Sequence, residues 1–474
     1  MKKFLILLIC LIVLISLCAC RASMPVNTIE DDTTSTYTSS TENTASQSPA
    51  EETLSNSQPT EDSTIPKETS PSSQETSKAP INQQNKPSNS QNQSSGSGTM
   101  QQEDLLASGD CIATSGKWKI TKDGTLTIYG KDRPEDKSSY TWGPYADQVK
   151  KIVVDDGITH IPERAFYCFK NVTEVVLADT VETIGSEAFS NCYALSKIVI
   201  PHKVKELCQG TFTGCTSLTT LSFAPNSQLT TLQSYFGSAG LKKFVAPPNL
   251  TTICHHAFAG SSNLEEVILD NGKDLTVDNY AFDECRSLKK LVLGDKIERI
   301  ASNAFSSCFS LSHYESYCAI NIELQSYTQL KTVIIGGNVT KIPSFSGCTS
   351  LQDVKITSPI TSIKSGQFMG CSSLKVLSIP NTVTTIEKYA FVNSGIQTLT
   401  IPASVKELGI CLFNKTALET IVFVGDPPVF ESNITDGTFS GLGKLIAYYP
   451  ANNPRWTQEM LQNHGATEVI WISQ

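Results

Sequence analysis

The sequence predicts an α/β solenoid in which about 23 residues form one coil, the coils stack with a parallel sheet on one side, and a cap closes each end. Three observations predict this fold. The first hundred residues divide into an apolar leader and a long polar segment. Phenylalanine then recurs at steps of mostly 22–24 residues, with a short alternating apolar pattern between. Because one coil cannot bury its own apolar side, such a repeat indicates stacked coils that share a continuous core.

Residues 1–20 are typical of an export signal. Two lysines precede an apolar run from Phe4 to Leu17, which is shorter than the roughly 20 residues that span a bilayer. The run ends in LCAC, which resembles a bacterial lipobox. This resemblance implies that Cys20 is lipidated and becomes the mature N-terminus of a lipoprotein. The alternative is an ordinary cleaved signal peptide with incidental cysteines.

Residues 21–104 are dominated by Ser, Thr, Gln, Asn, Pro and Glu, a composition that buries too little apolar surface to fold. We therefore expect a disordered tether with an end-to-end span of about 50 Å. Its 12 acidic and 4 basic residues give a charge of −8, and the signal adds +2, so residues 105–474 carry only −3 of the chain's −9. A nearly neutral folded region without a basic patch argues against nucleic acid as a partner.

Three signatures define the repeat. The phenylalanines that follow a small residue are Phe166, Phe189, Phe212, Phe258, Phe282, Phe305, Phe345, Phe368, Phe391 and Phe413. The pattern L-x-x-apolar-x-apolar begins at Leu195, Leu218, Leu264, Leu288, Leu330, Leu351, Leu374, Ile396 and Leu418. The pattern V-x-x-I follows after a turn, at Val181, Val204, Leu250, Ile297, Val339, Val383 and Val405.

Each signature predicts one part of a coil. L-x-x-V-x-I alternates as a short strand does, V-x-x-I forms the opposite wall, and A-F-x-x-C supplies a short helical or 3₁₀ turn. We assign residues 105–148 to a β-hairpin cap, 149–425 to the solenoid and 426–474 to a C-terminal cap. Gln233–Leu241 and Leu311–Thr328 depart from the pattern and predict local bulges.

The combined motif, I-P-x-x-V-x-x-I-x-x-x-A-F-x-x-C-x-x-L-x-x-[VIL]-x-I-P, resembles the BspA-like bacterial surface branch of the leucine-rich-repeat proteins. The resemblance covers about residues 149–425, and the segments 115–130 and 424–456 resemble that family's caps. It implies a leucine-rich-repeat solenoid with a concave parallel sheet, exposed on a bacterial cell surface. It also implies adhesion to host proteins, other cells or matrix, and it brings no catalytic residue.

Six cysteines stand three residues after the repeat phenylalanine: Cys192, Cys215, Cys285, Cys308, Cys348 and Cys371. Zinc sites need paired spacings that converge on one point, whereas these cysteines lie singly, one coil apart. We predict that they form a buried column, because cysteine packs as a small hydrophobe. Disulfides between neighbouring coils remain an alternative in an exported protein, although side chains stacked in parallel fit the required torsion poorly.

The remaining chemistry argues against an enzyme. The sequence has six histidines and no nucleophile elbow, Walker loop or G-x-G-x-x-G motif. His255 and His256 are adjacent, and we expect neighbouring side chains in a turn to point apart rather than share a metal. Glu265 and Glu266 diverge on a strand, which gives glycosidase chemistry little support. We predict no catalytic residue, no metal and no cofactor.

The candidate binding surface is the outward face of the sheet. One outward position per strand is usually β-branched, and this column contains Val176, Val199, Val245, Ile268, Val292 and Ile334. Lys289 and Lys331 lie beside it and supply part of a polar rim. An exposed apolar stripe often marks a binding site, although β-branched residues also suit any strand surface.

The sequence therefore predicts a lipid-anchored protein on the extracellular face of a bacterial membrane. The expected partners are an extracellular protein or glycan on host or neighbouring cells, and the membrane itself through the lipid. Two alternatives stay open. The chain could be a structural envelope spacer without a specific ligand, or an accessory module of a surface hydrolase.

Overall fold

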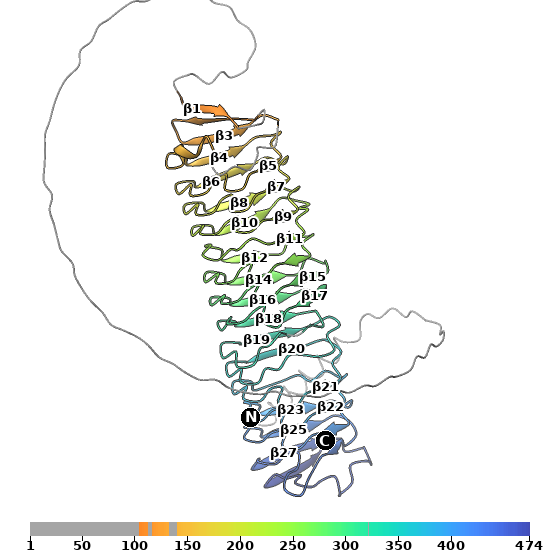
Figure 1. Cartoon of the computed structure of the whole chain (residues 1–474). Coiled ribbons are helices and arrows are strands. Elements are labelled where there is room, and N and C mark those ends of the chain that lie inside the picture. Colours follow the sequence, from red (N-terminus) through yellow and green to blue (C-terminus); the bar gives the residue numbers. More distant parts are fainter. Residues whose placement is uncertain (1–103, 112–115, 132–139, 321) are drawn as a thin grey trace, which may run out of the picture. The chain divides into compact units, whose positions relative to one another are not determined.

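The computed structural model of the chain describes residues 104–111, 116–131, 140–320 and 322–474. These residues belong to one compact unit, Ser94–Gln474. Figure 1 shows their coils stacked in a single long column. The predicted signal, Cys20 and nearly all of the predicted tether lie outside the described residues. We number the coils 1 to 12 by the residue at the repeat-phenylalanine position, from Phe166 in coil 1 to Phe413 in coil 12.

The L-x-x-V-x-I pieces form the long-strand wall, in which neighbouring strands are parallel. Inward side chains alternate with outward ones, as in β8, where Ile198 and Ile200 are buried and Val199 is exposed. Its strands are β4 (Lys151–Val154), β6 (Glu174–Leu177), β8 (Lys197–Ile200), β10 (Thr220–Phe223), β12 (Lys243–Val245), β14 (Glu266–Leu269), β16 (Lys290–Leu293), β18 (His313–Ser316), β19 (Thr332–Ile335), β20 (Asp353–Ile356), β23 (Thr398–Ile401) and β25 (Thr420–Phe423).

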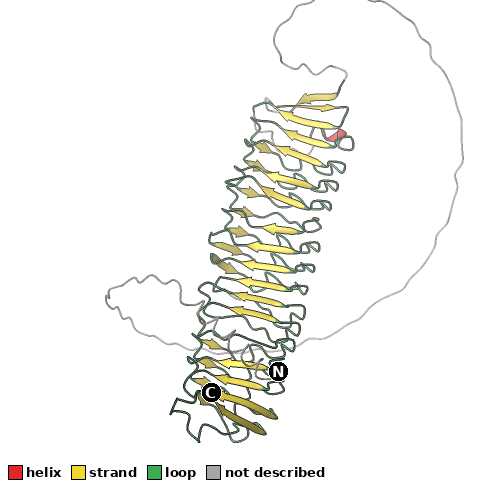
Figure 2. Cartoon of the chain, turned by 180° about the vertical axis from the view of Figure 1, so that it is seen from behind, coloured by secondary structure: helices red, strands yellow, loops and turns green. Residues whose placement is uncertain are grey.

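The V-x-x-I pieces form a second parallel wall of shorter strands. These are β5 (His160–Ile161), β7 (Thr183–Ile184), β9 (Glu206–Leu207), β11 (Thr231–Leu232), β13 (Thr252–Ile253), β15 (Leu275–Val277), β17 (Ile297–Ile300), β21 (Ser362–Ile363), β22 (Thr385–Ile386), β24 (Glu407–Leu408) and β26 (Val429–Phe430). The two walls run side by side, and the column bends only slightly (Figure 2). The sheet face that the sequence predicted to be concave is nearly flat, because both walls are built of strands.

Both ends extend the long-strand wall. β2 (Lys117–Thr121) pairs antiparallel with both β1 (Leu105–Asp110) and β3 (Thr125–Tyr129), and β3 pairs in parallel with β4. The 3₁₀ helix η1 (Gly143–Tyr145) follows, beside buried Trp142, whose Nε1 donates to the Ala165 carbonyl at 2.8 Å. At the other end β27 (Lys444–Tyr449) pairs with β25 and with β28 (Glu468–Ser473). These strands cover the two ends of the core, as a solenoid requires.

The A-F-x-x-C segment contains less helix than predicted. In coil 2, Phe189 lies between Glu187 (φ 54°) and Asn191 (φ 60°), and these left-handed residues prevent a continuous helix. The amides of Glu187, Phe189 and Asn191 instead donate to carbonyls of coil 3, at 2.8–3.0 Å. The solenoid of about 23-residue coils is therefore confirmed, but its described coils are strand and turn, and the one helix among the described residues is η1, which precedes them.

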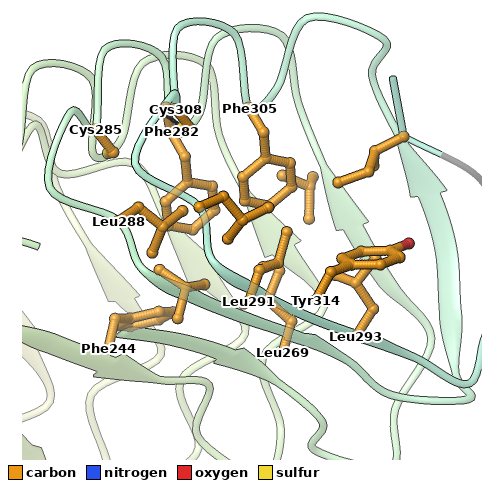
Figure 3. Close-up of a cluster of buried hydrophobic side chains, with 14 of the residues drawn as sticks. Phe244, Leu269, Phe282, Cys285, Leu288, Leu291, Leu293, Phe305, Cys308 and Tyr314 are labelled. Atoms are coloured by element: carbon orange, nitrogen blue, oxygen red, sulfur yellow. Dashed lines mark hydrogen bonds between the residues drawn. The ribbon is translucent and has the colours of Figure 1, made fainter. Parts of the chain in front are cut away.

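The core is a stack of aromatic rings between the two walls. Phe282 and Phe305 have ring centroids 4.9 Å apart at an interplanar angle of 2°. Figure 3 shows these rings side by side, with Leu288 and Leu291 below them and Cys285 near the turns. Phe236 and Leu324, which the sequence pattern missed, fill the phenylalanine position in coils 4 and 8. Each stacked pair adds about 0.5–1.5 kcal/mol to the burial of apolar area.

Candidate functional site

The outward side of the long-strand wall, which we call the strand face, carries two columns of side chains. The first residue of each strand lies in one column and the third residue in the other. The register aligns them from coil to coil, as in Glu266↔Lys290 and Ile268↔Val292 between β14 and β16. The first column is charged in many coils, and the second is mainly apolar.

The charged column is held by ion pairs between neighbouring coils. Lys151 Nζ lies 3.2 Å from Glu174. Glu266 lies between two lysines, at 2.9 Å from Lys243 and 3.1 Å from Lys290. The hydrogen bond from Lys243 lowers the pKa of Glu266, and Lys290 adds to this effect. These pairs fix the polar margin of the strand face.

The predicted apolar column is exposed in part. Val176, Val199 and Val245 expose 42%, 55% and 44% of their surface, respectively. Ile268 and Ile334 are half-buried. Val199 is the most exposed of the five.

Val292 corrects the prediction, because only 8% of it is exposed. The register places it between Ile268 and Glu315 of the neighbouring coils, and these longer side chains flank the shorter valine. Val292 keeps its outward register but offers little contact area. The stripe is also interrupted, since Ser222, Glu315 and Lys355 occupy the same column.

The two predicted rim lysines differ in their surroundings. Lys289 Nζ donates to Glu265 Oε2 at 2.7 Å, so its charge is already paired at the margin of the strand face. Lys331 is exposed beside β19. Glu315 is also engaged, because it accepts a hydrogen bond from the Tyr317 hydroxyl and lies 3.5 Å from His313 Nε2.

The prediction of a buried cysteine column is confirmed. The six repeat cysteines are at most 1% exposed, and none of the twelve described cysteines is in a disulfide. Each repeat thiol donates to a carbonyl of the preceding coil at 3.1–3.3 Å, as Cys215 does to Phe189. Burial raises the pKa of Cys215 to about 12 and that of Cys348 to about 11. Buried thiols of this kind stay protonated at neutral pH, and a protonated thiol is a poor nucleophile.

Two coils without the cysteine keep the same hydrogen bond. Ser261 Oγ donates to the Phe236 carbonyl at 3.3 Å, and the Tyr327 hydroxyl donates to the Phe305 carbonyl at 3.2 Å. In coil 1 the buried position belongs to Phe169, and Cys168 beside it is half-buried. The position is therefore buried in these coils, and in coils 5 and 8 a hydroxyl replaces the thiol as the donor.

The expectation that His255 and His256 point apart is wrong. Their ring centroids are 3.8 Å apart, because the left-handed backbone of His256 (φ 59°) turns its ring toward its neighbour. The described residues contain no group of three or more His, Cys, Asp or Glu side chains placed to hold a metal ion. The pair lines a surface notch with Gln209, Gln233, Tyr235, Cys254 and Ala259, of about 600 Å³.

Three overlapping segments of the chain, residues 144–265, 230–344 and 343–463, match the family model described as the BspA type leucine rich repeat region. Together they cover more than half of the chain. The chain belongs to the BspA-type leucine-rich-repeat family. Repeat proteins of this type are generally non-catalytic binding scaffolds. A comparison with curated proteins finds no match.

Solved structures of bacterial leucine-rich-repeat proteins are similar to this chain. A repeat protein from Eubacterium ventriosum is 22% identical, with 70% of this chain and 100% of that chain covered and a TM-score of 0.28. A leucine rich cell surface protein from Faecalibacterium prausnitzii is 23% identical, with 66% and 94% covered and a TM-score of 0.28. A repeat protein from Bacteroides ovatus is 19% identical, with 77% and 100% covered and a TM-score of 0.35.

Coil 4 departs from the usual spacing of the repeat. Its phenylalanine, Phe236, follows Leu232 by four residues, whereas Phe212 follows Leu207 by five. This missing residue lies at the notch, so the altered spacing is the sequence signal that could have located it. Over the part of the chain that the structure describes, no helix is long and apolar enough to cross a membrane.

Proposed function

We propose that this protein is a surface adhesin whose strand face binds an extracellular protein, and that a lipid on Cys20 anchors it to the outer face of a bacterial membrane. The observation that carries the proposal is the exposure of Val176 and Val199 on the adjacent strands β6 and β8. Apolar side chains exposed side by side favour a partner that removes them from water.

The charged column supports a protein partner. Lys151–Glu174 and the pairs around Glu266 border the valines, which gives an apolar centre with a polar margin. Interfaces between proteins have this arrangement. The family membership and the cell-surface description of the Faecalibacterium relative support a place outside the cell.

The strand face is tested by adhesion of cells that display the full-length protein to immobilised matrix proteins and epithelial cells. Val176→Lys combined with Val199→Lys should reduce adhesion at least about tenfold, because two buried valines contribute on the order of 1.5 kcal/mol or more each. Val429→Lys is the matched control, since Val429 is 65% exposed but lies on β26, in the wall of shorter strands. Equal adhesion of the double variant and the control would contradict the binding role and leave a structural spacer as the explanation.

The anchor has its own test. Wild-type and Cys20→Ala cells are grown with a labelled fatty acid, and the protein is followed in membrane and soluble fractions. The proposal expects label and membrane association in the wild type and neither in the variant. A labelled variant, or an unlabelled wild type, would reject lipidation of Cys20 without affecting the strand-face proposal.

A further inference from the structure

The notch in coil 4 arises because that coil is shortened. Phe236 follows Leu232 by one residue fewer than the equivalent pairs in coils 3 and 5, and the notch lies at this shorter turn. In coils 1 and 2 the turn amides donate to the next coil, but within the described residues the amides of Gly210, Phe212 and Gly214 make no backbone hydrogen bond to coil 4. The Thr213 hydroxyl donates to the Tyr235 carbonyl instead, at 3.0 Å. The hydrogen bonding from turn to turn is thus interrupted between coils 3 and 4.

Aromatic rings form one side of this notch. Tyr235 is 40% exposed, and its ring lies over Gly237, where a Cβ atom would overlap it. His256 is backed by Tyr280 of coil 6, with ring centroids 5.3 Å apart and an interplanar angle of 15°. His255 packs edge-on against both His256 and Tyr280. These contacts hold the rings in place before any ligand binds.

The polar groups of the notch are uncharged or weakly basic. Gln209 and Gln233 present carboxamides, which donate and accept hydrogen bonds, and the imidazoles add two further polar edges. No Asp, Glu, Lys or Arg is among the residues that line it. Its volume of about 600 Å³ falls in the range of about 300–1,000 Å³ that small-molecule sites occupy.

This chemistry selects one ligand class. A charged ligand finds no opposite charge here, and a purely apolar ligand would leave the carboxamides unpaired at a cost. A neutral pyranose has C–H faces that pack on aromatic rings and vicinal hydroxyls that pair with carboxamides. We propose that the notch of coil 4 binds a neutral sugar unit of a glycan. This site lies at the turns, away from the strand face, and does not depend on the function proposed for that face.

Direct binding tests the proposal. The full-length protein is titrated with neutral sugars, namely glucose, galactose, mannose, fucose and N-acetylglucosamine, with and without EDTA, by saturation-transfer NMR. At least one sugar should bind, and His256→Gly should weaken its binding about two- to tenfold. Glycine suits the left-handed backbone of His256, as Gly210 shows at the same position in coil 3, so this variant should fold. Tyr235→Ala should weaken binding further.

Tyr389→Gly is the matched control, because Tyr389 occupies the equivalent left-handed position in coil 11 (φ 61°) and is 39% exposed. It should bind sugar as the wild type does. A second readout is Cys254, a half-buried thiol of the notch, which a bound sugar should protect from a maleimide while half-buried Cys168 stays as reactive as before.

Three outcomes would overturn the proposal. The first is that none of the five sugars binds. The second is that His256→Gly and Tyr235→Ala bind the sugar as tightly as the Tyr389→Gly control does. The third is that EDTA abolishes binding and Zn²⁺ alone binds in a manner that requires His256, which would make the notch a metal site.

Discussion

The thiol of Cys215 donates a hydrogen bond to the carbonyl oxygen of Phe189, 3.1 Å away in the preceding coil. The same carbonyl also accepts the amide of Cys192 in its own coil, at 3.3 Å. The thiol therefore supplies a second donor to an oxygen that is buried beside the ring stack. Because the same bond recurs at all six repeat cysteines, each of them links its coil to the one before it.

Substitution at Cys215 should separate the hydrogen bond from the packing. Cys215→Ser keeps a small donor, as Ser261 does in coil 5, so we expect a loss of at most about 1 kcal/mol in the free energy of unfolding. Cys215→Ala removes the donor and leaves a small cavity, so it should cost about 1–2 kcal/mol. Urea denaturation of the full-length protein measures both. If alanine is tolerated better than serine, the hydrogen bond contributes nothing and packing alone explains the residue.

The buried thiols should make the fold sensitive to alkali. Thiols of the unfolded chain lose their protons near pH 9, whereas burial raises the pKa of Cys215 to about 12 and that of Cys348 to about 11. The folded state therefore holds more protons above pH 9, and the free energy of unfolding must fall as the pH rises from about 9 to about 12. Cys215→Ser combined with Cys348→Ser should flatten this decline.

The measurement is Tm between pH 7 and pH 11 for the wild type and the double variant. Lysine and tyrosine ionisation affects both proteins alike, so the difference between their slopes isolates the thiols. Parallel curves would show that the two cysteines ionise in the folded state as readily as in the unfolded chain.

Replacing glycine by alanine should destabilise the fold more at Gly185 than at Gly366, because only Gly185 lies close to a neighbouring backbone. A Cβ atom at Gly185 would overlap the Glu163 amide of coil 1, which cannot move without disturbing the stack. A Cβ atom at Gly366 meets only the end of Met369, at 3.9 Å, so alanine there costs only the left-handed strain of φ 66°, about 1–2 kcal/mol. Gly185→Ala should be the more destabilising in thermal denaturation, and an equal loss would mean that coil 1 shifts freely.

The buried side chains of this protein could be predicted from its sequence, because the pattern that places them repeats from coil to coil. Phe189, Cys192 and Leu195 recur in register, and each coil meets the same neighbours as the last, so periodicity alone identifies the inward side chains. The left-handed residues that break the helix were harder to predict. Glycine marks them in coil 3, as at Gly214, but coil 2 uses Glu187 and Asn191, which give no comparable signal.

The candidate sites depend on differences between coils, which periodicity does not describe. Val292 has the same pattern position as Val199 but is covered, because the sizes of its neighbours in adjacent coils decide its exposure. The notch needs three coils at once: a shortened turn in coil 4, Gln209 before it and His255 after it. The altered spacing could be read from the sequence, but which side chains it exposes could not.

Restoring the missing residue tests how the notch forms. An alanine inserted between Ser234 and Tyr235 gives coil 4 the five-residue spacing of Leu207 and Phe212. The longer turn should fill the space between Gln209 and His255 and allow the regular hydrogen bonds from coil 3. We expect sugar binding to be lost while Tm stays the same or rises. The hydroxyl of buried Ser234 has no hydrogen-bond partner within the described residues, and the regular turn should supply one. An inserted protein that folds and still binds sugar would show that the shortened turn does not create the site.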